Sequence, residues 1–226
     1  MVVWFEIMTS SKLKKVLEQT EHHPYPLPKR PRVLRVRRHE LLFMHWPVPK
    51  YWLRPLVPPV LKLDTFFGSA WLGVMPFRMK RTRPRFLPAL PRLSGFPELK
   101  FCTYVTAEGK PGIWFFSLEA STPIAARPAR ATHALAYFDA KMSCRTFGDK
   151  VQYERARTHK GASSARLAAS YRPLSEPFES RPGTLENVLT KRCCLYSADK
   201  KERIRRGDIY HRMCDPCRRQ RYRWRS

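Results

Sequence analysis

The sequence predicts an α+β fold that is mainly antiparallel β-sheet, curved into a barrel, with a few short helices. The 226 residues are 43% hydrophobic and 12% aromatic, which is enough for one packed domain. Twenty-one prolines against nine glycines favour short elements joined by fixed turns. Many short apolar runs, rich in aromatic and β-branched residues, are separated by turn residues, and this pattern is typical of strands.

The first strands are predicted in the segment that begins at residue 39. Residues 39–48 form an apolar run ended by proline, and residues 50–59 fit a short helix or turn. Residues 61–79 read as two strands on either side of Gly68. Both faces of the second of these strands are apolar, so we expect it to be covered on two sides.

The remaining elements follow from two hairpin patterns and a helix cap. Residues 99–120 predict a hairpin around AEGKPG, and residues 136–157 a second hairpin that turns at FGDK. Thr184 has the side chain of a helix cap, so a short helix is expected after it, running into a strand. Further predictions are a helix in 122–135, a strand in 165–174 and a closing strand in 201–211.

We predict three regions along the chain. Residues 1–38 are a basic, proline-rich extension, expected to be poorly ordered, in which residues 10–19 are the start of a marginal helix. Residues 39–211 are the barrel domain. Residues 212–226 are an arginine-rich tail.

The charge of the chain suggests partners but does not define them. Forty-four Lys and Arg against eighteen Asp and Glu give a net charge of +26, which attracts phosphate groups non-specifically. An alternative reading is therefore a basic nucleic-acid-associated protein that uses its arginine-rich ends. No apolar run approaches the roughly 18 residues of a membrane span, so we expect no membrane partner.

The N-terminal sequence and the six cysteines indicate the cellular compartment of the protein. The apolar residues of the N-terminus precede its positive charges, which is the reverse of a secretory leader. We therefore expect a cytoplasmic protein whose cysteines are free and buried as small apolar side chains. A single Cys-x-x-Cys, Cys214 and Cys217, supplies two ligands where a structural zinc site needs four, so we expect no metal.

Seven stretches follow one another in order over roughly residues 39–211: LLFMHWPVP, LRPLVPPVLKLDTFFGSAWLGVMPFRM, FPELKFCTYVT, GKPGIWFFSLEA, ALAYFDAKMS, GTLENVLTKRCCLYSAD and RGDIYH. Together they resemble the bacterial YqjF-like family, known as domain of unknown function 2071. That family is grouped with acetoacetate decarboxylase-like folds. The resemblance implies a β-barrel around a pocket for a small anionic or carbonyl-bearing molecule, with no assigned activity and no cofactor.

Departures from the family pattern raise doubt about activity. Lys100 and Cys102 replace an asparagine and an arginine, and the tail replaces the family's final segment. Acetoacetate decarboxylase uses a Schiff-base lysine, but the corresponding region, residues 121–135, contains no lysine. We expect no decarboxylation by that route, and whether the chain is an enzyme stays open. We also hypothesise that residues from about 213 onward are read out of frame.

The candidate ligand-binding residues each have a structural alternative. His45 can hold a ligand oxygen or be a core histidine, and Glu98 can orient a pocket cation such as Arg54 or form a structural ion pair. Lys100 is either a pocket amine or a surface lysine. Tyr104 and Arg130 can bind an anion. Asp64 reads as a turn residue, and Arg192 and His211 read as ties at strand ends.

Overall fold

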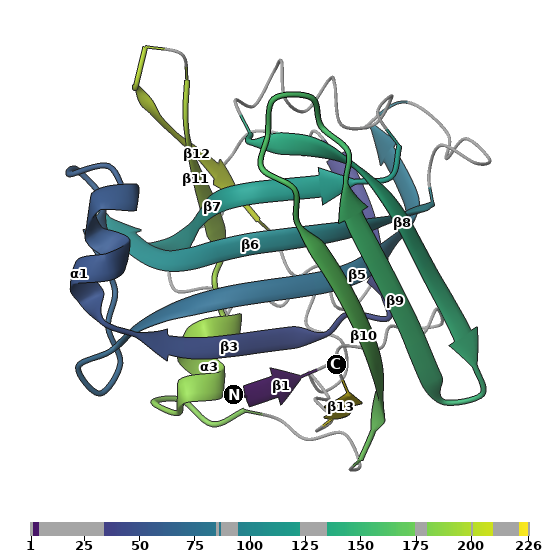
Figure 1. The fold of residues 1–226 in the computed structure, drawn as a ribbon. Coiled ribbons are helices and arrows are strands. Elements are labelled where there is room, and N and C mark those ends of the chain that lie inside the picture. Colours follow the sequence, from purple (N-terminus) through teal and green to yellow (C-terminus); the bar gives the residue numbers. More distant parts are fainter. Residues whose placement is uncertain are drawn as a thin grey trace.

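The computed structural model of the chain describes residues 2–4, 34–84, 86, 95–122, 135–174, 180–199, 201–209 and 222–225. Figure 1 shows a strongly curved sheet that forms an open half-barrel, with short helices near its edges. This confirms the predicted α+β class dominated by antiparallel strands, although the barrel is not closed.

The described elements are thirteen strands in one sheet and three short helices. The strands are β1 (Val2–Trp4), β2 (Leu34–His39), β3 (Phe43–Val48), β4 (Lys62–Leu63), β5 (Ala70–Pro84), β6 (Phe96–Ala107), β7 (Lys110–Ala120), β8 (Tyr137–Phe147), β9 (Lys150–Arg157), β10 (Arg166–Pro173), β11 (Cys194–Ala198), β12 (Ile204–Asp208) and β13 (Tyr222–Arg225). The helices are α1 (Lys50–Leu53), the 3-10 turn η2 (Arg54–Leu56) and α3 (Leu185–Thr190).

The centre of the sheet is the antiparallel run β3-β5-β6-β7. The β6–β7 hairpin turns where Glu108 and Gly109 adopt positive φ, which is why the sequence has glycine there. Beyond β7 the sheet bends: β8 pairs with β7 in parallel over only residues 118–120, then β8, β9 and β10 continue antiparallel. In Figure 1 these three strands cross in front of the central run.

The two faces of the central strands are covered by different partners. One face, which we call the aromatic face, carries Met75, Phe77, Phe115 and Leu118, with Leu189 of α3 packed in the same cluster. The other face, which we call the covered face, packs against β8, β9 and β10. Its cluster consists of Leu42, Met44, Leu99, Cys144, Val151, Tyr153, Ala169 and Tyr171.

Several predictions are confirmed. Both hairpins form, Thr184 caps α3 by accepting a hydrogen bond from the Asn187 amide, and β5 has apolar packing on both faces. Phe43 and Trp71 pack against the same cluster as buried Phe115, as a shared apolar core requires. The predicted helices in residues 10–19 and 122–135 lie outside the described residues, apart from the ends of the second segment.

The basic segment before residue 39 contributes more than the sequence suggested. Residues 34–39 form β2, which pairs antiparallel with β5 and brings Val36 against the aromatic-face cluster. The sequence places these residues in an extension because three arginines within four positions, Arg35 to Arg38, resemble a solvated linker. In the structure the arginines alternate between the faces of a strand. The proposed boundaries at 38 and 212 stay predictions.

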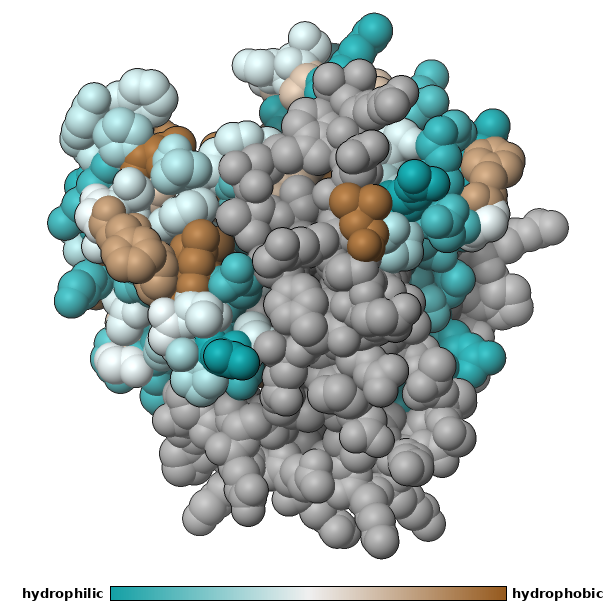
Figure 2. All heavy atoms as spheres, turned by 90° about the horizontal axis from the view of Figure 1, so that it is seen from below, coloured by the Kyte–Doolittle hydropathy of each residue, from teal (hydrophilic) through white to brown (hydrophobic). Residues whose placement is uncertain are grey.

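One end of the molecule exposes apolar side chains. Tyr51, Trp52 and Leu56, from α1 and η2, are 71%, 62% and 59% exposed. Figure 2 shows brown hydrophobic groups on the left, the side on which α1 lies in Figure 1. None of the helices in the described ranges is both long and apolar enough to pass through a bilayer.

Candidate functional site

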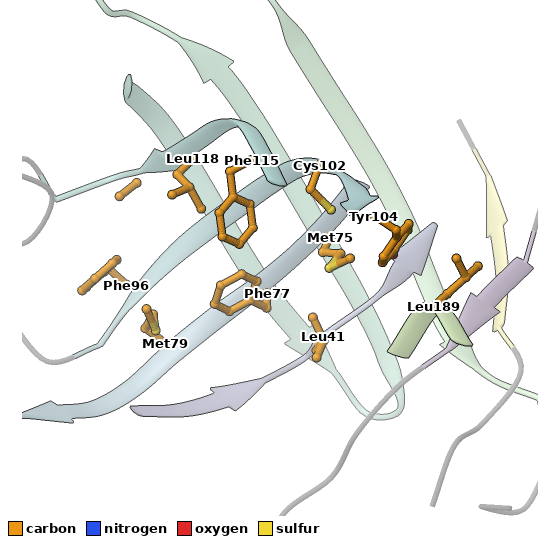
Figure 3. Packing of buried hydrophobic residues seen from close by; sticks show 11 residues of the cluster. Leu41, Met75, Phe77, Met79, Phe96, Cys102, Tyr104, Phe115, Leu118 and Leu189 are labelled. Atoms are coloured by element: carbon orange, nitrogen blue, oxygen red, sulfur yellow. The ribbon is translucent and has the colours of Figure 1, made fainter. Parts of the chain in front are cut away.

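A row of four side chains on β6 gives the aromatic face its polar groups. Glu98, Lys100, Cys102 and Tyr104 alternate along the strand and therefore point to the same side of the sheet. Figure 3 shows Cys102 and Tyr104 beside Met75, in the same layer as Phe77 and Phe115. The row thus places two ionisable groups and a phenol among aromatic and sulfur-containing side chains.

Lys100 is the most unusual member of the row. Its side chain is only 14% exposed, and its Nζ lies 5.0 Å from the ring centroid of Phe77 and 5.4 Å from that of Phe115. Burial, assisted by the positive charge of Arg38, lowers the pKa of Lys100 from 10.5 to about 7. Of the two alternatives given for Lys100, the surface lysine is therefore the one that its burial contradicts.

Glu98 is the partner of this amine. Its side chain is 1% exposed, and its Oε1 lies 4.0 Å from Lys100 Nζ, while Tyr137 donates a hydrogen bond of 3.3 Å to Oε2. Burial raises the pKa of Glu98, and the positive charges of Lys100 and Arg38 partly oppose that rise. Burial therefore disfavours the charged form of both the carboxyl and the amine.

Arg38 adds a permanent cation on the same face. It comes from β2, and its guanidinium carbon lies 5.9 Å from the ring centroid of Phe77. Arg38 is not among the candidates expected from the sequence, because it lies in the segment assigned to the basic extension. The alternation of Val36 and Arg38 was the only sequence feature that could have placed it on this face.

A second polar group lies at the other end of the row. His45 is fully buried on β3, and its Nε2 lies 2.5 Å from the hydroxyl of Tyr104. Burial raises the pKa of Tyr104 well above 10, so the phenol stays protonated. The histidine is thus buried in the core and has a side-chain partner there.

Arg192 and Asp64 form an ion pair next to Tyr104, at the same end of the row. Arg192 is 3% exposed, forms an ion pair with Asp64 and lies with its guanidinium carbon 5.0 Å from the Tyr104 ring centroid. Thr106 also donates a hydrogen bond of 3.0 Å to Asp64. Asp64 therefore balances the charge of the buried Arg192, which corrects its interpretation as a turn residue. Arg192 contacts the Tyr104 ring as well as Asp64, so it does more than fix the end of a strand.

Two other candidates do not join this group. Arg54 donates hydrogen bonds to the carbonyl oxygens of Leu61 and Pro58, at 2.7 Å and 2.6 Å, and to that of Val57. Its guanidinium therefore stabilises the turn after η2, and the carboxylate of Glu98 is paired with other residues. Arg130 and His211 lie outside the described residues.

The described cysteines are free and buried, as predicted. Burial raises the pKa of Cys102 to about 12 and that of Cys193 to about 11, so neither is a thiolate at neutral pH. No group of three potential metal ligands occurs within the part of the chain that the structure describes.

Comparison with known proteins agrees with this architecture. The sequence profile of a family described as uncharacterised conserved proteins, domain of unknown function 2071, matches residues 35–224. The chain belongs to this family. It is 42% identical over 179 residues to the uncharacterised protein YqjF of Bacillus subtilis strain 168, covering 79% of this chain and 73% of that protein.

Solved structures show the same fold at low sequence identity. Acetoacetate decarboxylase from Legionella pneumophila superposes with a TM-score of 0.53 at 13% identity, covering 89% of this chain and 77% of that one. The enduracididine biosynthesis enzyme MppR, solved in complex with pyruvate, superposes with a TM-score of 0.51 at 14% identity, covering 78% and 69%. The fold is therefore acetoacetate decarboxylase-like.

Proposed function

We propose that the aromatic face binds a small anionic molecule that carries a carbonyl group, with Lys100 and Arg38 as its main contacts. The observation that carries the proposal is the Lys100 amine, held between two aromatic rings and 4.0 Å from a buried carboxyl group. A buried cation or carboxylate without water is costly, and a ligand that supplies the complementary charge offsets that cost.

The chemistry of the pair favours a carbonyl group as the contact. An amine whose pKa is about 7 is substantially neutral at physiological pH, and a neutral amine attacks a carbonyl carbon. The resulting carbinolamine loses water when the Glu98 acid protonates its hydroxyl. The products are a protonated imine, a carboxylate on Glu98 and one water molecule, so the atoms and charges balance.

Arg38 accounts for the anionic part of the ligand. Its guanidinium is always charged and can hold a carboxylate with two parallel hydrogen bonds. Pyruvate, which the structural neighbour MppR binds, has a carboxylate next to its carbonyl. A 2-oxo acid of this size is therefore the class that we expect, and an enclosed chamber around it stays a prediction.

The test is reductive trapping of the imine with pyruvate and borohydride, read by intact mass and by peptide mapping. We expect one reduced pyruvate on Lys100, and none in Lys100→Arg. Lys80→Arg is the matched control, because Lys80 is 41% exposed and should leave trapping unchanged. Arg38→Gln should weaken trapping by pyruvate more than trapping by acetone, which has no carboxylate. Adducts spread evenly over surface lysines would refute the proposal.

A further inference from the structure

Four arginines line a cleft formed by β2 and the end of β5. The cleft has a volume of about 110 Å³ and is lined by Arg35, Arg37, Arg81 and Arg83. We call it the arginine cleft. It is formed on the opposite face of β2 from Arg38, because Val36 packs on the aromatic face and side chains alternate along a strand.

The backbone is distorted where it builds this cleft. The pairing of β2 with β5 shifts by one residue between Arg35 and Arg37, and Arg81 has a φ of +51° in the left-handed region. The extra residue in β5 changes the face on which later side chains lie, so Arg83 comes directly opposite Arg35. A left-handed conformation is unfavourable for arginine, and such distortions concentrate at functional positions.

Three of the cleft arginines form no ion pair with a carboxylate in the described part of the chain. Arg35 and Arg83 are a like-charge pair across the strands, which destabilises a sheet. Within the described ranges, no carboxylate forms an ion pair with Arg37, Arg81 or Arg83. The nearby Glu40 lies 3.7 Å from Arg78 and 3.6 Å from Lys80, so it pairs with other cations.

We propose that the arginine cleft binds a phosphate group carried by a small molecule. Guanidinium groups present forked pairs of donors that match phosphate oxygens, and several of them suit a doubly charged anion. The volume is well below the roughly 300 Å³ at which sites for drug-sized ligands begin, so it suits a single tetrahedral group. All four lining residues are arginines, without the aromatic rings on which unpaired bases stack, and this favours a small ligand over single-stranded nucleic acid.

The experiment is a titration of the full chain with inorganic phosphate and with glycerol 3-phosphate, following melting temperature and binding heat at constant ionic strength. Arg37→Gln/Arg83→Gln removes two cleft charges. Arg145→Gln/Arg166→Gln removes two exposed charges from β8 and β10 and is the matched control. Because the chain carries a net charge of +26, this control separates the cleft from general attraction of anions.

The expected result is saturable binding whose dissociation constant rises at least about tenfold in the cleft variant and stays within about twofold in the control. Equal losses in both variants, or the same stabilisation by chloride, would overturn the proposal. Two further titrations use vesicles that contain phosphatidic acid and, separately, a single-stranded oligonucleotide. If either binds through the cleft while neither small phosphate does, the small-ligand assignment is wrong. A failure of imine trapping at Lys100 has no bearing on this outcome, since the cleft variants retain Lys100.

Discussion

Lys100 Nζ and Glu98 Oε1 lie 4.0 Å apart on the same side of β6, both nearly buried, with the rings of Phe77 and Phe115 near the amine. This separation is longer than a hydrogen bond, so the two groups influence each other's pKa through their charges rather than through a direct hydrogen bond. The relationship determines how the protein should respond to pH and to substitution.

The first prediction concerns pH. The folded-state pKa of Lys100 is about 7, below the ordinary value of 10.5, so the unfolded chain binds this proton more tightly. Between those two values the unfolded state holds more protons, and the free energy of unfolding contributed by Lys100 rises with pH. We expect the difference between the native protein and Lys100→Met to change by about 1 kcal/mol per pH unit from about pH 7.5 to 9.5. Urea denaturation measures it, and a constant difference would refute a lowered pKa.

Removal of the Tyr104 hydroxyl should destabilise the core. Tyr104→Phe leaves the Nε2 of buried His45 without the partner that lies 2.5 Å away, and an unsatisfied buried polar group costs about 1–3 kcal/mol. In a His45→Leu background the same change should cost less, because no imidazole nitrogen then loses the phenol as its partner. Equal costs in the two backgrounds would show that the hydrogen bond contributes nothing.

The ion pair of Asp64 with Arg192 should contribute strongly to the free energy of unfolding, because Arg192 is buried. Asp64→Asn removes the charge that balances a guanidinium only 3% exposed, and we expect a loss of about 3 kcal/mol of stability. Arg203→Gln is the control, because it breaks the exposed pair with Asp199 and should hardly change the melting temperature. Thermal denaturation compares the two variants.

The approach of β7 to β11 requires a glycine. A Cβ at Gly112 would lie 2.6 Å from Cys194 Sγ and 2.9 Å from the Cys194 carbonyl oxygen, so Gly112→Ala should separate these strands and cost about 1–3 kcal/mol. Gly95→Ala is the control, since its Cβ would come no closer than 3.6 Å to another residue. A Gly112→Ala protein as stable as the control would contradict the packing described for β7 and β11.

The strands could be predicted where turn residues and apolar alternation coincide. The turns at Gly109 and Gly148, and the cap at Thr184, fixed the two hairpins and α3 closely. β2 was not predicted because its closely spaced arginines, seen in the sequence alone, resemble a solvated linker. Only the pairing with β5 shows that they lie alternately on two faces.

The site was harder to predict than the strands. Glu98, Lys100 and Tyr104 were recognised as candidates, but alternation alone cannot tell which side of a doubly covered strand receives a buried amine. Asp64 and Arg192 are 128 residues apart in the sequence, and no local pattern links them. The burial of Lys100 and the position of Arg38 depend on these long-range pairings.

The most direct test of a buried, reactive amine is the titration of Lys100 itself. Lysine labelled with ¹³C at the ε position gives a resonance for each side chain, and Lys100→Arg assigns the relevant one. We predict a midpoint near pH 7, and a higher midpoint in Arg38→Gln, because the positive charge of Arg38 lowers the pKa of Lys100. A Lys100 resonance that titrates near pH 10.5 with the surface lysines would contradict the account.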